Sequence, residues 1–231
     1  MKQHTSRAFA QELEQLREMV LRMGGHVETA IAEAMRALVE RDPDLARKCI
    51  REDHAVNKME VDIDELCVSI LARRQPAAED LRLLISGLKT STDLERIGDL
   101  AVNMCERTLD LLEVPSLKPL IDLPRMAELA RGMLSDALNA YVKGDAELAE
   151  EVCIRDDLVD RLNEQVFREL ITYIMEDPHT ISQALALMMI SRYLERIADH
   201  ATNIAEMVIY QVKGRDIRHM RVGEEHAGKT G

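Results

Sequence analysis

Residues 93–106 of this chain read DLERIGDLAVNMCE, and residues 193–206 read YLERIADHATNIAE. From Leu94 to Glu106 the two copies agree at 8 of 13 positions, and Glu, Asp, Asn and Glu recur at the same spacing. At about 100° per residue on an α-helix, these four side chains lie within a band of roughly 80°. The repetition therefore predicts two helices that carry acidic stripes at matching places.

Further similarity between the two halves indicates that each copy of the repeat covers about half of the chain. The sequence DHAVN at 53–57 resembles DDLVD at 156–160, at an offset of 103 residues. The offset has fallen to 100 at the acidic stripes, which predicts a three-residue difference in the loops that hold Pro76 and Pro178. A tandem duplication of a three-helix unit explains this pattern.

Prolines separate long segments with helical apolar spacing, because proline is tolerated in the first turn of a helix and excluded from its interior. Helices are predicted at about 5–41, 44–74, 77–113, 123–143, 145–176 and 179–213. The predicted fold is all-α, with two tandem three-helix bundles and an elongated shape. Its predicted parts are a first repeat (1–114), a proline-rich linker (115–124), a second repeat (125–213) and a disordered, Gly-rich tail (214–231).

Composition narrows the class of protein further. The formal net charge of −12 argues against general nucleic-acid binding, which needs a basic surface. The four cysteines have no paired spacing, which favours a reducing compartment. The N-terminus resembles no signal peptide, and the longest apolar run, Ala184–Ile190, is too short to span a bilayer. We therefore expect a cytoplasmic protein.

The acidic stripes are the candidate functional site. On each helix they continue the angular line of an apolar stripe, where carboxylates are costly unless they are paired or bound to metal. A second apolar face lies roughly opposite, with Leu94, Ile97 and Ala101 on one helix and Leu194, Ile197 and Ala201 on the other.

Neighbouring helices carry further acidic faces that could meet the acidic stripes, formed by Asp53, Asn57, Glu60 and Asp64 and by Asp156, Asp160 and Asn163. The candidate metal ligands are Glu95, Asp99, Asn103, Glu195, Asp199, Asn203, Asp53 and Asp156. All-oxygen ligands suit divalent or trivalent ions such as Mg²⁺, Mn²⁺, Ca²⁺ or iron better than Zn²⁺.

Two other interpretations of the same residues stay open. The acids could form solvated faces of a plain helical scaffold, because acids four residues apart are common on exposed helices. They could also serve a metal-dependent enzyme or a metal store. The sequence carries no Glu-x-x-His pairs on facing helices, no Walker motif and no catalytic-triad spacing, so no catalytic residue is predicted.

The two motifs LERIGD at 94–99 and LERIAD at 194–199 resemble the duplicated acidic signature of the PhoU family. MGGHVE at 23–28, MEVDIDE at 59–65 and YIMEDP at 173–178 are similar to the same family. The resemblance extends over about residues 8–218. One departure is Ala198 at the position of Gly98, and another is His200 at the position of Leu100, where histidine could add a metal ligand.

The resemblance implies two tandem three-helix bundles, a homodimer and metal ions bound by the acidic motifs. It also implies a non-enzymatic adaptor that meets the membrane only through its partners. Those partners would be the ATPase subunit of the phosphate ABC importer and a phosphate-sensing histidine kinase. The expected outcome is modulated phosphate uptake and repression of the phosphate-starvation response when phosphate is plentiful.

Overall fold

The computed structural model describes residues 7–214, and within this range the chain forms six α-helices and one short 3₁₀ helix. They are α1 (Arg7–Glu40), α2 (Pro43–Arg73), α3 (Ala78–Leu111), α4 (Asp122–Lys143), α5 (Ala146–Glu176), η1 (Pro178–Thr180) and α6 (Ile181–Lys213). The six helices predicted from the sequence are confirmed, and their ends lie within two residues of the predicted ones. The predicted disordered tail lies outside the described residues except for Gly214.

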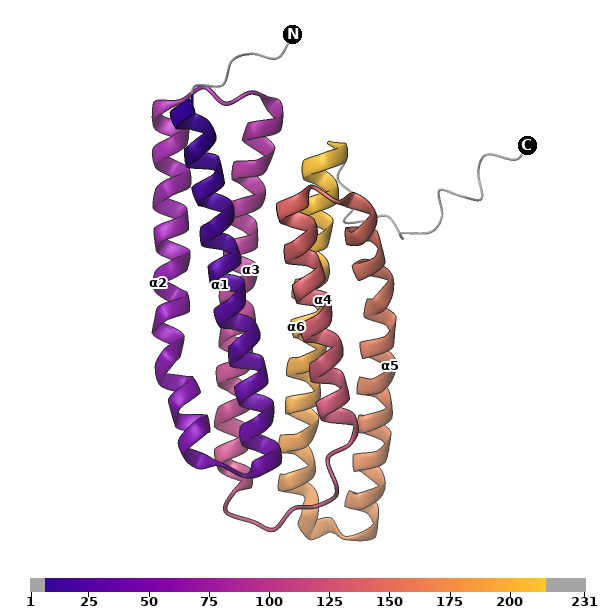
Figure 1. The fold of residues 1–231 in the computed structure, drawn as a ribbon. Coiled ribbons are helices and arrows are strands. Elements are labelled where there is room, and N and C mark those ends of the chain that lie inside the picture. Colours follow the sequence, from indigo (N-terminus) through magenta and orange to yellow (C-terminus); the bar gives the residue numbers. More distant parts are fainter. Residues whose placement is uncertain (1–6, 215–231) are drawn as a thin grey trace, which may run out of the picture.

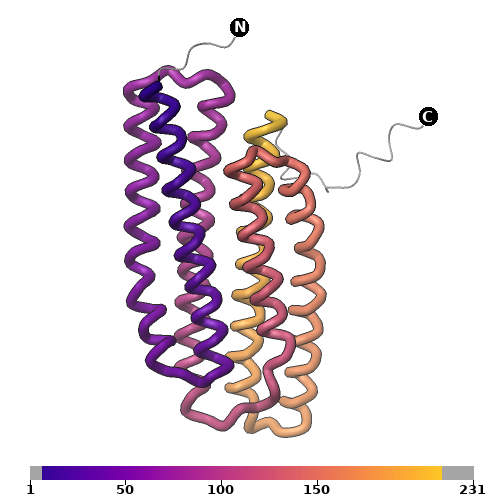
Figure 2. The backbone as a smooth tube through the Cα atoms, in the orientation of Figure 1, coloured from indigo at the N-terminus to yellow at the C-terminus, as the bar shows by residue number. Residues whose placement is uncertain are grey.

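The helices form two three-helix bundles that stand side by side (Figure 1), with α1, α2 and α3 in one and α4, α5 and α6 in the other. The segment between α3 and α4 crosses from the first bundle to the second at the lower end of the molecule in Figure 2. Lys118 fixes this segment to the second bundle, because its buried side chain forms an ion pair with Glu169 of α5. The all-α fold with two bundles is therefore confirmed.

The second helices of the two bundles correspond over their whole length. Helix α5 starts and ends 103 residues after α2. Residues 74–77 connect α2 to α3, whereas Asp177 alone connects α5 to η1. This is the three-residue difference that the sequence offsets predicted.

Aspartate side chains start the equivalent helices α2 and α5. Asp42 accepts hydrogen bonds from the backbone N–H groups of Asp44 and Leu45, and Asp145 does the same for Glu147 and Leu148. These bonds satisfy N–H groups that have no partner within the helix.

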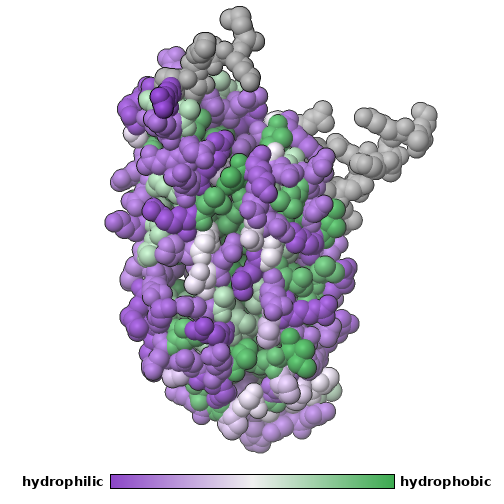
Figure 3. Space-filling view, viewed as in Figure 1, coloured by the Kyte–Doolittle hydropathy of each residue, from purple (hydrophilic) through white to green (hydrophobic). Residues whose placement is uncertain are grey.

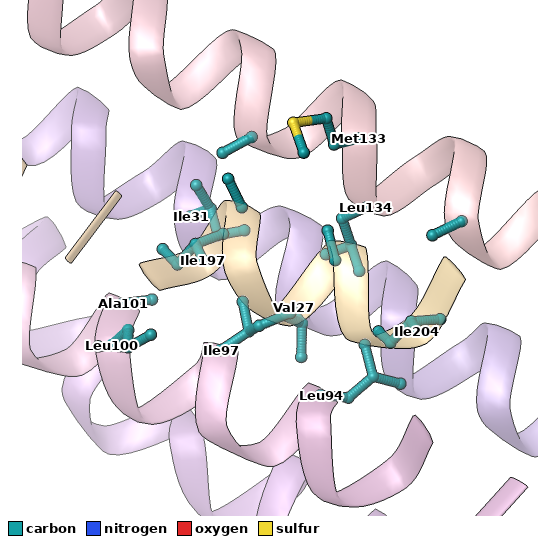
Figure 4. Close-up of a cluster of buried hydrophobic side chains, with 14 of the residues drawn as sticks. Val27, Ile31, Leu94, Ile97, Leu100, Ala101, Met133, Leu134, Ile197 and Ile204 are labelled. Carbon is teal, nitrogen blue, oxygen red and sulfur yellow. The ribbon is translucent and has the colours of Figure 1, made fainter. Parts of the chain in front are cut away.

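One continuous core joins the two bundles. Leu94 and Ile97 of α3 are fully buried together with Ile197 and Ile204 of α6. Figure 4 shows these side chains packed with others from α1 and α4, so four helices meet in the middle of the molecule. The sequence predicted two apolar faces on α3 and α6, and the structure uses the second face to bind the other bundle.

A close contact between α1 and α4 also joins the bundles. A Cβ atom at Gly24 of α1 would lie 2.3 Å from Leu138 Cδ1 of α4. At the adjacent Gly25, by contrast, a Cβ atom would have no neighbour within 4 Å. Gly24 therefore allows the two helices to pack closely, and α1 continues through both glycines without a break.

The outer surface is mostly hydrophilic on the face drawn in Figure 3, with smaller hydrophobic patches between the charged side chains. None of the helices within residues 7–214 is both long enough and apolar enough to cross a membrane.

Candidate metal-binding clusters

The first acidic cluster forms where α2 and α3 approach each other. A Cβ atom at Gly98 would lie 3.2 Å from Asp53 Oδ1 and 3.3 Å from Val56 Cγ1. Because Gly98 has no side chain, Asp53 can lie directly against the backbone of α3. This brings Asp53 beside Glu95 and Asp99, which stand one turn apart on the same face of α3.

Burial and mutual repulsion act on the acids of this first cluster. Partial burial raises the pKa of Asp53, and the charge of Asp99 raises it further, while a 3.0 Å hydrogen bond from Asn57 opposes the change. Burial also raises the pKa of Glu95, with added repulsion from Asp99. Arg96 lies 3.5 Å from both Glu95 and Asp99 and offsets part of this repulsion.

The second cluster lies at the matching place between α5 and α6. It consists of Asp156 and Asp160 on α5 and of Glu195 and Asp199 on α6. Glu195 is the most enclosed of these acids, with only 8% of its surface exposed. Arg192, one turn earlier on α6, forms an ion pair with it.

The largest pKa shift among these acids occurs in the second cluster. Burial and the charges of Asp199, Asp160 and Glu195 together raise the pKa of Asp156 to about 7. Burial raises the pKa of Glu195 and of Asp199 as well, and each gains a further increase from acids nearby. A cation placed among these carboxylates would relieve the repulsion.

The donor atoms suit a hard cation, because two of the carboxylate oxygens are left unsatisfied. Asp156 Oδ1 and Glu195 Oε2 are buried and have no hydrogen-bond partner among the described residues. Such oxygens are the ligands that Mg²⁺, Mn²⁺ and Ca²⁺ prefer. Within residues 7–214, however, no three His, Cys, Asp or Glu side chains are grouped so that they could hold a metal ion. A cation would therefore have to draw the carboxylates closer together.

The structure brings together six of the eight candidate ligands, three in each half: Asp53, Glu95 and Asp99, and Asp156, Glu195 and Asp199. Glu60 and Asp160 act on the same clusters through their charges, although the sequence identified them only as members of acidic helix faces. The shared helix face was the signal that could have selected them.

The two candidate asparagines are not part of the two acidic clusters. Within the described part of the chain, Asn103 forms no hydrogen bond with an acid of the first cluster. Asn203 donates a hydrogen bond of 3.4 Å to Asp93 on α3, in the other bundle. His200 faces the same residue, with its Nδ1 atom 2.8 Å from Asp93 Oδ1. The idea that His200 adds a ligand to the second cluster therefore has no support in this geometry.

The surroundings of the two clusters differ. Below the second cluster, a groove of about 580 Å³ between α5 and α6 is lined by apolar side chains that include Phe167, Leu185 and Met189, all of them exposed. Arg192 lines this groove and also pairs with Glu195, so groove and cluster adjoin. The first bundle has Asp64 at the position of Phe167, 103 residues earlier. The two halves thus present different surfaces to a partner.

Fold and site together define a class: a duplicated all-α protein with one acidic cluster in each repeat. The model of the PhoU domain matches residues 20–108 and 123–208, which is most of the chain. The chain therefore belongs to the PhoU family, as the resemblance of its motifs implied.

Relatives and solved structures agree with this assignment. The chain is 45% identical over 232 residues to the phosphate-specific transport system accessory protein PhoU homolog of Pseudomonas aeruginosa, covering 99% of this chain and 96% of the relative. It is 41% identical over 220 residues to the accessory protein PhoU of Escherichia coli K12, covering 95% and 91%.

A crystal structure of PhoU from Pseudomonas aeruginosa superposes with a TM-score of 0.86 at 46% identity, covering 90% of this chain and 100% of the other. The phosphate transport system regulatory protein PhoU from Streptococcus pneumoniae gives a TM-score of 0.83 at 30% identity, covering 90% and 98%. The duplicated bundle architecture is therefore shared with solved members of the family.

Proposed function

We propose that this protein is a negative regulator of the phosphate-starvation response and a modulator of phosphate uptake. It acts as a non-enzymatic, metal-binding adaptor between the ATPase subunit of a phosphate ABC importer and a phosphate-sensing histidine kinase. The observation that carries the proposal is nearly full-length similarity to proteins named as accessory to phosphate-specific transport. A homodimer is part of the same proposal.

The acidic clusters supply the metal-binding part of the proposal. Each cluster gathers carboxylates from two helices, and those in the second half carry raised pKa values because they are partly buried and repel one another. A bound Mg²⁺, Mn²⁺ or iron ion would neutralise this charge and hold α2 against α3, and α5 against α6. In this way the ion would set the shape of each bundle, and with it the affinity for a partner.

The proposal gives the carboxylates a binding role and no catalytic one. A metal-dependent enzyme or a metal store remains the alternative for the same residues. An assay of the metal-loaded protein for hydrolysis or electron transfer separates the two. Clear turnover would contradict a purely adaptor role, and turnover at the level of buffer with metal agrees with it.

The direct test is genetic. We would delete the gene and measure a phosphate-starvation reporter in cells that grow with ample phosphate. The proposal predicts high reporter expression in the deletion strain and repression once the wild-type gene is restored. A silent reporter in the deletion strain would contradict the regulatory role.

Complementation with a variant that replaces Glu95, Asp99, Glu195 and Asp199 by Ala then tests the metal clusters. We expect this variant to accumulate normally and to restore repression poorly. A control that replaces the exposed Glu128 and Glu151, outside the clusters, should repress like the wild type. Full repression by the cluster variant would separate metal binding from regulation.

A further inference from the structure

Two thiols meet across the interface between α2 and α3, away from the carboxylates. Cys49 of α2 and Cys105 of α3 are both buried and free of disulfides, and each thiol shifts the pKa of the other. Cys49 also donates to the carbonyl of Ala30 on α1, at a sulfur-to-oxygen distance of 3.7 Å. The first bundle therefore holds a pair of thiols inside its three-helix core.

The helix register gives independent support for this pairing. Val56 and Gly98 lie opposite each other, with Val56 Cγ1 3.3 Å from the position of a Cβ atom on Gly98. Because the helices run antiparallel, seven residues back along α2 and seven residues forward along α3 lead to Cys49 and Cys105. The register therefore places Cys49 opposite Cys105, two turns from the close approach at Gly98, and a disulfide between them requires Cα atoms roughly 4.4–6.8 Å apart.

Cys49 can be reached from solvent although its exposed fraction is small. It lines a pocket of about 470 Å³ between the three helices of the first bundle, together with Arg22, His26 and Asp53. A hydroperoxide is small enough to enter a space of this size. Cys105, by contrast, is fully buried and does not line this pocket, so Cys49 is the thiol that peroxide reaches first.

The second bundle lacks this feature. By the offsets of 103 and 100 residues, the counterparts of Cys49 and Cys105 are Val152 and Ala205, both fully buried. Core packing at this position therefore does not require sulfur in either helix. In the first bundle, both members of one contacting pair are cysteine.

We propose that Cys49 and Cys105 form a peroxide-sensitive thiol pair that oxidises to a disulfide between α2 and α3. The Cys49 sulfur, after losing its proton to water, attacks one oxygen of hydrogen peroxide. The O–O bond breaks, and the products are a sulfenic acid on Cys49 and hydroxide, which takes up the proton to become water. The Cys105 thiol then attacks the Cys49 sulfur, the S–O bond breaks, and a second water molecule leaves. Peroxide is thus reduced and the two thiols are oxidised.

The test uses the full chain, reduced and then treated with hydrogen peroxide under native conditions. Free thiols are alkylated with iodoacetamide after denaturation, and peptides are mapped by mass spectrometry without reduction. We expect loss of alkylation at Cys49 and Cys105 and a cross-linked peptide that joins them. Cys67 and Cys153 should stay alkylated, because burial raises the pKa of each thiol to about 12.

Two variants, each lacking one cysteine, test the proposed pairing further. Cys105→Ala copies the residue of the second bundle, so we expect a folded protein without the cross-link, whose Cys49 sulfenic acid is trapped by dimedone. Cys67→Ala serves as the matched control and should form the cross-link as the wild type does. The proposal is overturned if Cys49 and Cys105 remain alkylated after peroxide treatment of the folded wild type. It is also overturned if the cross-link forms only when urea has first unfolded the chain.

Discussion

At the scale of single residues, the acids of the two clusters are held in a state that costs stability when no cation is bound. Asp156 is the clearest case, because burial and the acids around it raise its pKa to about 7 from a usual value of 3.8. A carboxyl whose pKa is raised by folding binds its proton more tightly in the folded state. Ionisation of Asp156 therefore lowers the free energy of unfolding.

This gives a pH-dependent prediction for Asp156→Asn. In the wild type, the loss of stability caused by ionised Asp156 is absent below about pH 4, grows as pH rises towards 7, and is complete above that. We expect the variant to exceed the wild type by roughly 1–2 kcal/mol in free energy of unfolding near pH 8, because solvent at the open helix face screens part of the full shift. The difference should vanish near pH 4. Urea unfolding without metal, at both pH values, measures it.

The control is Glu164→Gln, which removes one exposed acid of the same helix outside the cluster. We expect this control to follow the wild type within about 0.5 kcal/mol at both pH values. If Asp156→Asn and the wild type differ by the same amount at pH 4 and pH 8, the repulsion described for the second cluster is wrong.

At the scale of helices, sequence periodicity predicted the elements well and their partners less well. Prolines and aspartate caps act locally, so the helix ends could be read within two residues. The spacing of Leu94, Ile97 and Ala101 predicted a second apolar face on α3. It could not show that this face would pack on α6, because periodicity does not identify the partner of a buried stripe.

The same limit explains the asparagines. Glu195 and Asn203 lie on the same face of α6, but about 80° apart around the helix. The angles at which the neighbouring helices cross α6 decide which of them packs against each edge of this face. Asn203 lies at the edge that meets α3, where Asp93 accepts its hydrogen bond. Glu195 lies at the opposite edge, with Asp199 between the two, and the structure places both acids beside those of α5.

The adjacent glycines of α1 provide a test at this scale. Gly24→Ala would force a methyl group against Leu138, which is itself buried, so we expect a loss of about 1–3 kcal/mol in free energy of unfolding. Gly25→Ala meets open space, and we expect a gain of roughly 0.5–1 kcal/mol from better helix propensity. Chemical denaturation of both variants measures the difference. Equal effects of the same sign would show that α1 and α4 do not pack at Gly24 as described.

At the scale of the whole molecule, the duplication places two acidic clusters on one rigid body. The bundles share a continuous core through α1, α3, α4 and α6, and Arg82 of α3 donates a hydrogen bond of 3.0 Å to the Gln211 carbonyl of α6. The clusters themselves lie between α2 and α3 and between α5 and α6. The account therefore predicts two metal sites, each dependent on its own acids.

Metal binding by the purified protein tests this central claim most directly. We would titrate the metal-free chain with Mn²⁺ by calorimetry and compare the wild type with Glu95→Ala/Asp99→Ala and Glu195→Ala/Asp199→Ala. The account predicts saturable binding to the wild type, and loss of one half of the bound metal in each double variant. Circular dichroism would check that both variants stay helical. Undetectable binding to the wild type, or equal metal content in all three proteins, would contradict it.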